Sequence, residues 1–326
     1  MSATAGPPAP IFSVDDDGAP RYRGIGLREV RAMPFGRLWG LLAGTERDLP
    51  PAEPYHLPVR TGDTRADVLS ALAQLAPVWS YRPLSEISLE QALDNLARAS
   101  AMTLSFVAQS ARGVDVPAVP QREVDLMETA TERFLVRWRG EADPAAVRAL
   151  DAFWLAVAEN GLSPSTRTVR LAAEVGADVA GCLAAAVAVA GSPFLGGAVA
   201  RGLDVVEEAE RSGDARPAVR ALVERHGAVP GFGEALPADL RAQVVREACV
   251  ELGARRLDAA DAVATAAEEV LAERGVPAHE RAPNTMFWGA ILLDHLGVPP
   301  PMMCSVYVCG RTAGWSAHVL EVRSGR

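Results

Sequence analysis

The chain has 326 residues, of which 49% are hydrophobic and 22% are charged, and its formal net charge is −9. This length gives room for a sizeable core and predicts two domains. The acidic balance argues against a general nucleic-acid-binding protein, which would present a basic face, but it is compatible with a local basic pocket for an anionic ligand.

The cysteines and the apolar stretches indicate the compartment. Residues 1–20 lack the basic start and apolar core of a signal peptide. The most apolar run, residues 182–190, falls far short of the roughly 20 residues that a membrane span needs. Four scattered cysteines suit neither a disulfide framework nor a metal site: Cys182, Cys249, Cys304 and Cys309. We therefore expect a cytoplasmic protein with no membrane partner, no metal and no resident cofactor.

The first half of the chain predicts a series of helices behind a flexible arm over residues 1–21. Ser88 and Gln91 have the spacing of a capping box, and Asp143-Pro144 pairs an N-cap with a proline at the first helical position. Glycine and proline separate the apolar periodic segments. The helices are expected over residues 35–44, 64–76, 88–110, 123–139 and 143–160.

The second half predicts one long buried helix and then a smaller group of helices. Residues 165–190 form the longest apolar segment, and their second half is nearly all Ala, Val, Gly and Leu. Four more strongly charged segments are predicted over residues 197–211, 216–224, 238–253 and 258–274. Residues 284–297 are apolar again, and a last helix is predicted over residues 311–322. The expected class is all-α, with a large domain over residues 22–197 and 284–326 and a small domain over residues 198–283.

A sharp break separates the two predicted domains at Ser192–Gly197. Pro193 interrupts the helical pattern, and two adjacent glycines let another backbone or a ligand come close. The sequence alone predicts a turn between helices at this point.

Six segments in chain order resemble motifs of the citrate synthase family, and together they extend over nearly the whole chain. The third of them, Ser192–Gly197, resembles a segment read as GPLHGG in the family. The six are Tyr22–Gly24, Ala158–Thr166, Ser192–Gly197, Val229–Glu234, Asn284–Trp288 and Gly310–His318.

The resemblance implies an all-helical, usually dimeric protein whose two domains close over the site. It also implies condensation of an acyl-CoA with a 2-oxo acid, typically acetyl-CoA with oxaloacetate. In that chemistry a base removes a proton next to the thioester carbonyl, and histidines donate to the enolate and to the ketone. Arginines hold the carboxylates of the acceptor.

The sequence departs from the family pattern where the resemblance places this chemistry. Leu195 takes the place of the enolate-stabilising histidine, and Glu234 that of the ketone-polarising histidine. Met286 takes the place of the catalytic aspartate, and Asn160 that of a further histidine near the oxo acid. Since leucine and methionine neither donate nor accept a proton, the standard mechanism is not expected.

The predicted binding groups are kept. Arg311 matches an arginine that binds an acceptor carboxylate, and Arg241 resembles a second one, although a solvated helix charge explains Arg241 equally well. Val229, Gly231 and Gly233 are the candidate CoA-binding residues, because glycines permit close approach of a ligand.

Three interpretations stay open at this point. The first is a non-catalytic relative that keeps the fold and the dimer. It would pair with an active citrate synthase paralogue, bind a CoA ester and a dicarboxylate, or act as a regulator. The second is an enzyme of altered chemistry that uses Glu234, whose pKa burial would raise, with Asn160 as a hydrogen-bond donor. A surface salt bridge is the ordinary alternative for Glu234. The third is weak citrate synthase activity through groups not yet identified.

Overall fold

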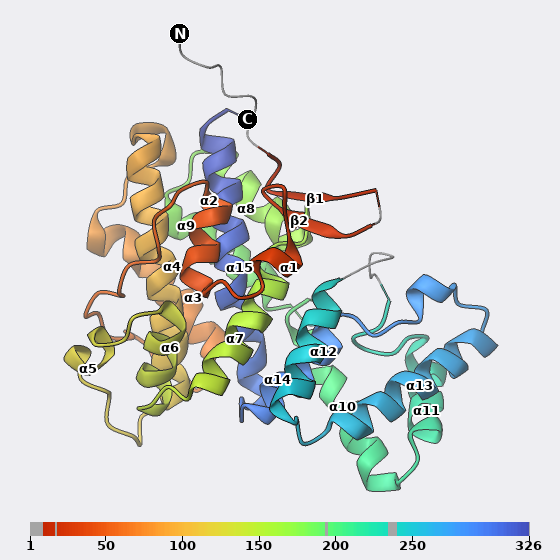
Figure 1. Ribbon diagram of the computed structural model, residues 1–326. Coiled ribbons are helices and arrows are strands. Elements are labelled where there is room, and N and C mark those ends of the chain that lie inside the picture. Colours follow the sequence, from red (N-terminus) through yellow and green to blue (C-terminus); the bar gives the residue numbers. More distant parts are fainter. Residues whose placement is uncertain (1–8, 17, 193–194, 234–239, 326) are drawn as a thin grey trace.

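The computed structural model describes residues 9–16, 18–192, 195–233 and 240–325, and helices dominate it (Figure 1). The all-α class is confirmed. The described strands form one small antiparallel sheet of β1 (Phe12–Val14), β2 (Pro20–Tyr22) and β3 (Ile25–Gly26), with Phe12 opposite Tyr22. Part of the predicted N-terminal arm is therefore a β-hairpin, and the side chains of Ile11 and Tyr22 are buried in the core.

Nine helices precede the turn at residue 192 in the described chain. Their bounds are α1 (Leu27–Val30), α2 (Phe35–Ala43), α3 (Thr64–Trp79), α4 (Leu89–Arg112), α5 (Gln121–Asp125), α6 (Ala130–Arg139), α7 (Pro144–Val157), α8 (Pro164–Glu174) and α9 (Val179–Ala190). Short 3₁₀ turns occur at Leu84–Glu86 and, later in the chain, at Ala278–Glu280.

Six further helices follow the turn in the described residues. They are α10 (Gly197–Ser212), α11 (Ala215–His226), α12 (Leu240–Leu252), α13 (Leu257–Glu273), α14 (Thr285–His295) and α15 (Pro300–Arg323). Helices α10 to α13 gather at the lower right of Figure 1, where α12 packs against both α7 and α14. The division into two domains at residues 198 and 283 stays a prediction. None of the described helices combines the length and the apolarity that a membrane span requires.

The predicted caps are confirmed. The Ser88 hydroxyl accepts from the Gln91 amide at 3.1 Å, and the Gln91 side chain accepts from the Ser88 amide at 2.9 Å. Asp143 accepts from the Ala146 amide at 2.9 Å and so begins α7. These local bonds satisfy backbone groups that the first helical turn leaves unpaired.

Three predicted helix ranges were wrong. The long helix over residues 165–190 is two helices, because Gly176 adopts a φ of +83° and Asp178 caps α9 by accepting from the Gly181 amide at 2.9 Å. The segment over residues 123–139 is also two helices, since Thr129 and Glu132 form a second capping box that begins α6. The last helix begins at Pro300 rather than near Arg311.

Helix α15 lies at the centre of the larger group of helices and is buried over most of its length (Figure 1). A Cβ added at Gly310 would come within 2.6 Å of a Val157 methyl group, and one at Gly314 within 2.1 Å of the Glu159 carboxylate. Both glycines therefore allow the end of α7 to lie directly on α15. This packing places the intervening Arg311 beside the α7–α8 turn.

Candidate functional site

The site is built on the turn between α7 and α8, where Glu159 is fully buried and Asn160 is exposed. The Asn160 amide donates to the Glu159 carboxylate at 2.8 Å. From the N-terminal sheet, the Tyr22 hydroxyl donates to the Leu155 carbonyl at 2.9 Å, and the Glu159 carbonyl lies 3.3 Å away. The hairpin, α7 and the turn therefore hold one another in a fixed position.

Arg241 of α12 reaches the same turn from the other group of helices. Its Nη1 donates to the Asn160 Oδ1 at 2.6 Å and to the Glu159 carbonyl at 3.1 Å, and its guanidinium carbon lies 5.6 Å from the centre of the Phe12 ring. Arg241 is only 5% exposed, so it is not the solvated helix charge that the sequence left as an alternative. The structure brings Asn160 and Arg241 together, as the prediction of one site requires.

Arg311 of α15 lies on the inner side of the turn and is 1% exposed. Its two terminal nitrogens donate to the Val157 carbonyl at 3.1 Å and to the Thr166 hydroxyl at 2.8 Å. The nearest Glu159 carboxylate oxygen is 3.7 Å away, and the buried Nε of Arg311 makes no hydrogen bond within the part of the chain that the structure describes. The charge of Arg311 is thus balanced by Glu159.

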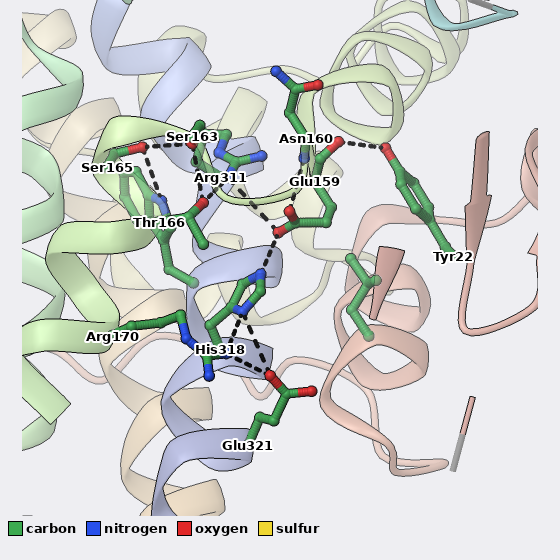
Figure 2. A network of polar contacts seen from close by, with 12 residues as sticks. Tyr22, Glu159, Asn160, Ser163, Ser165, Thr166, Arg170, Arg311, His318 and Glu321 are labelled. Atoms are coloured by element: carbon green, nitrogen blue, oxygen red, sulfur yellow. Dashed lines mark hydrogen bonds and ion pairs between the residues drawn. The ribbon is translucent and has the colours of Figure 1, made fainter. Parts of the chain in front are cut away.

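A polar chain continues from Glu159 toward the surface, as Figure 2 shows. The His318 Nδ1 lies 3.1 Å from an Arg170 nitrogen, which can only donate, so Nδ1 accepts. In neutral His318 the proton is then on Nε2, which lies 3.4 Å from the Glu159 carboxylate. Arg170 also pairs with Glu321. The chain connects the buried carboxylate to a half-buried ion pair.

The charge state of Glu159 follows from these neighbours. Burial alone raises the pKa of Glu159, but Arg311 and His318 outweigh burial and hold this pKa below its usual value. Glu159 is therefore the anion that neutralises the buried arginine.

The glycine loop and the start of α14 form a second part of the predicted site. Asn284 caps α14 by accepting from the Met286 amide at 2.9 Å, and its own amide donates to the Gly231 carbonyl at 2.8 Å. Its side chain also donates to the Gly233 carbonyl at 3.1 Å. Gly231 and Gly233 are thus brought close to Met286, which is half-buried.

These glycines also have a packing role. Gly231 has a φ of +80°, and an added Cβ would come 2.8 Å from the Phe287 Cβ. Val229 and Gly233 line a pocket of about 460 Å³ near Leu271 and His279. Two of the three predicted CoA-binding residues therefore share a cavity. Glu234 lies outside the described residues.

Leu195 lies in the turn between α9 and α10 and is half-buried. The next residue, Gly196, donates to the Ala190 carbonyl at 2.8 Å, and an added Cβ would meet Cys304 at 2.5 Å and the Tyr307 ring at 3.3 Å. The turn thus packs on α15 one helical turn before Arg311.

Three residues of this region escaped the sequence analysis: Glu159, Tyr307 and His318. Tyr307 is buried, its pKa is raised by burial, and its hydroxyl makes no hydrogen bond with the part of the chain that the structure describes. Tyr307 and Arg311 are four residues apart on α15, so they lie on one face of the helix. This spacing could have identified Tyr307 from the sequence. Glu159 and His318 lie inside two of the six recognised motifs, but only the fold shows that they meet.

The comparisons with known proteins identify the family. The family profile described as "Citrate synthase, C-terminal domain" matches residues 8–326. The chain belongs to the citrate synthase family. A Mycobacterium tuberculosis relative named "Putative citrate synthase 2" is 47% identical over 312 residues, which is 94% of this chain and 83% of the relative. The 2-methylcitrate synthase of Shewanella oneidensis is 28% identical over 198 residues, or 59% of this chain and 51% of that one.

Solved citrate synthase structures share the fold. The enzyme of Thermoplasma acidophilum, solved with carboxymethyl coenzyme A and oxaloacetate, superposes with a TM-score of 0.79 at 17% identity and covers 98% of this chain and 90% of that chain. The Pyrobaculum aerophilum citrate synthase gives 0.74 at 20% identity, with 98% and 87% covered. The citrate synthase fold is thus retained although most residues differ.

Proposed function

We propose that this citrate synthase-family chain binds a dicarboxylate at Arg241 and Arg311 and a CoA thioester beside Val229 and Gly233, and does not condense them by the standard family mechanism. The observation that carries this proposal is the chemistry at Leu195 and Met286. The first has no group that donates to an enolate, and the second has no oxygen that accepts the thioester's α-proton. A loss of about 10² to 10⁴ in rate is typical for each such group.

The binding half of the proposal rests on groups that are kept. Arg241 and Arg311 meet at the Glu159–Asn160 turn, and arginine forks suit carboxylates. The Thermoplasma neighbour holds oxaloacetate and a CoA analogue in the same fold. For the CoA part, the proposed place is the pocket beside Val229 and Gly233.

The assembly state is part of the proposal. We expect a homodimer or a heteromer with an active citrate synthase paralogue, in which this chain supplies ligand binding. Altered chemistry through Glu234 is the competing outcome. This alternative predicts that the wild type releases CoA from an acyl-CoA and that Glu234→Ala abolishes this release.

Isothermal titration with oxaloacetate tests the binding half. Wild type is expected to bind saturably, and Arg241→Gln to bind at least about tenfold more weakly, because a charge-assisted contact is lost. Asn160→Ala, at an exposed position, is expected to weaken binding while preserving the fold. Arg148→Gln on the surface of α7 is the charge-matched control. No saturable binding by wild type, or equal affinities of wild type, Arg241→Gln and Asn160→Ala, would refute this half.

A further inference from the structure

A basic cavity lies at the C-terminal end of α4, and none of the site residues described above lines it. Its volume is about 580 Å³. Three arginines and one histidine line it, with no aspartate or glutamate among the lining residues: Arg60, Arg112, Arg137 and His56. Such a concentration of positive charge is unexpected in a chain whose net charge is −9.

The three arginines are held by neutral partners. Arg60 donates to the Gln109 carbonyl at 2.7 Å, and Arg112 donates to the Pro117 and Trp138 carbonyls at 2.6 and 2.9 Å. Arg137 donates to the Gln121 side chain at 2.7 Å. Among the described residues no carboxylate lies within ion-pair distance of any of these three guanidinium groups.

Arg137 carries the strongest indication of a missing counter-charge. It is 9% exposed, and burial lowers its pKa. The charge of Asp125 opposes this lowering, but Asp125 forms no ion pair with Arg137. The Gln121 side chain, which accepts from Arg137, donates to Asp125 at 2.8 Å. A buried cation without a paired anion is costly unless a ligand supplies the charge.

Part of the cavity lining is apolar. The segment after α4 contributes Val114 and Val116, which are 72% and 47% exposed, together with Pro117 and Pro120. Exposed valines beside convergent arginines suit a ligand that has both a charged group and an apolar body.

We propose that this cavity binds a small organic polyanion, whose phosphate or carboxylate groups meet Arg60, Arg112 and Arg137 and whose apolar part covers Val114 and Val116. The forked guanidinium groups fit either kind of oxyanion. The cavity is large enough for a nucleotide-sized molecule. This site goes beyond the proposed function, since its occupant touches none of the residues of the candidate active site.

Titration with three probes tests the site and separates the ligand classes. ATP, tripolyphosphate and citrate are added to wild type in turn at low ionic strength. Saturable binding of at least one probe is expected, and ATP is expected to bind more tightly than tripolyphosphate because only ATP has an apolar body. Citrate as the tightest probe would assign the carboxylate class.

Variants locate the binding. Arg60→Gln with Arg112→Gln is expected to weaken the tightest probe at least about tenfold. Arg28→Gln with Arg148→Gln removes the same charge from exposed positions that line a different cavity and is expected to leave affinity within about twofold. Val114→Ser is expected to weaken ATP and to leave tripolyphosphate unchanged.

Two outcomes would overturn the proposed site. One is that no probe binds saturably, and the other is that the Arg28/Arg148 control loses as much affinity as the Arg60/Arg112 variant. Because Arg112 anchors two carbonyls, thermal unfolding checks the double variant, and the exposed Arg60→Gln alone is expected to weaken binding severalfold in a protein of unchanged stability.

Discussion

At the scale of single residues, Glu159 determines the state of the site, because it is the buried anion that Arg311 and His318 share. Sequence reasoning identified Arg311 and Asn160 through their motifs. It missed the intervening Glu159, because its partners lie about 150 residues away on α15 and only the fold brings them together. The proposed carboxylate-binding role of Arg311 therefore depends on a residue that no local pattern marks.

Replacing Glu159 tests this dependence. Glu159→Gln is expected to lower the free energy of unfolding at pH 7 by about 3–5 kcal/mol, because a buried arginine loses its counter-charge. Urea denaturation measures the change. A difference below about 1 kcal/mol would mean that Arg311 is compensated in another way.

The same residue predicts a pH dependence. Since the folded pKa of Glu159 is depressed, its stabilisation is fully present above the ordinary pKa of 4.5 and is lost as the pH falls through the lower folded value. Wild type is therefore expected to lose stability below about pH 4.5 more steeply than Glu159→Gln. Parallel pH profiles of the two proteins would contradict the assignment.

Replacing Tyr307 separates an effect on oxaloacetate binding from an effect on the free energy of unfolding. Tyr307→Phe is expected to change unfolding free energy by less than about 0.5 kcal/mol, because its hydroxyl has no partner among the described residues, and to weaken oxaloacetate binding severalfold. Tyr22→Phe is the matched control. It removes the bond to the Leu155 carbonyl and is expected to cost about 1–2 kcal/mol of stability. Unchanged affinity in Tyr307→Phe would exclude this hydroxyl from the site.

At the scale of elements, the capping residues predicted where helices begin better than apolar periodicity predicted where helices are interrupted. Ser88, Asp143 and the motif at Asn284 all begin helices in the structure. The break at Gly176 was missed, although a glycine followed by an aspartate two residues later is a stop and start signal. The N-terminal hairpin was missed because its strands have only three residues each, too few for a period to show.

Gly231 allows its loop to pack closely against Phe287 of α14. Gly231→Ala is expected to cost more stability than Gly227→Ala by about 1–3 kcal/mol. Both have positive φ, at +80° and +74°, but only a Cβ at Gly231 would collide with Phe287, whereas nothing lies within 4 Å of one at Gly227. Calorimetric melting compares the two. Equal losses would show that backbone strain alone acts at Gly231.

At the scale of the whole molecule, the chain keeps the citrate synthase fold while the residues at the expected chemical positions have changed. The resemblance of six motifs predicted the family and the all-α class, and both are confirmed. It did not predict how the arginines are used. Arg241 and Arg311 are held at one turn from two groups of helices, an arrangement that follows from α12 packing on α7 and from the glycines of α15.

The most direct test of the central claim is the rate of CoA release from acetyl-CoA in the presence of oxaloacetate. We expect the purified wild type to stay at the background rate, and the triple variant Leu195→His, Met286→Asp and Glu234→His to release CoA faster than that rate. Turnover by the unaltered chain at about 1 s⁻¹ or faster, within the ordinary range of enzymes, would show that the chain catalyses the condensation.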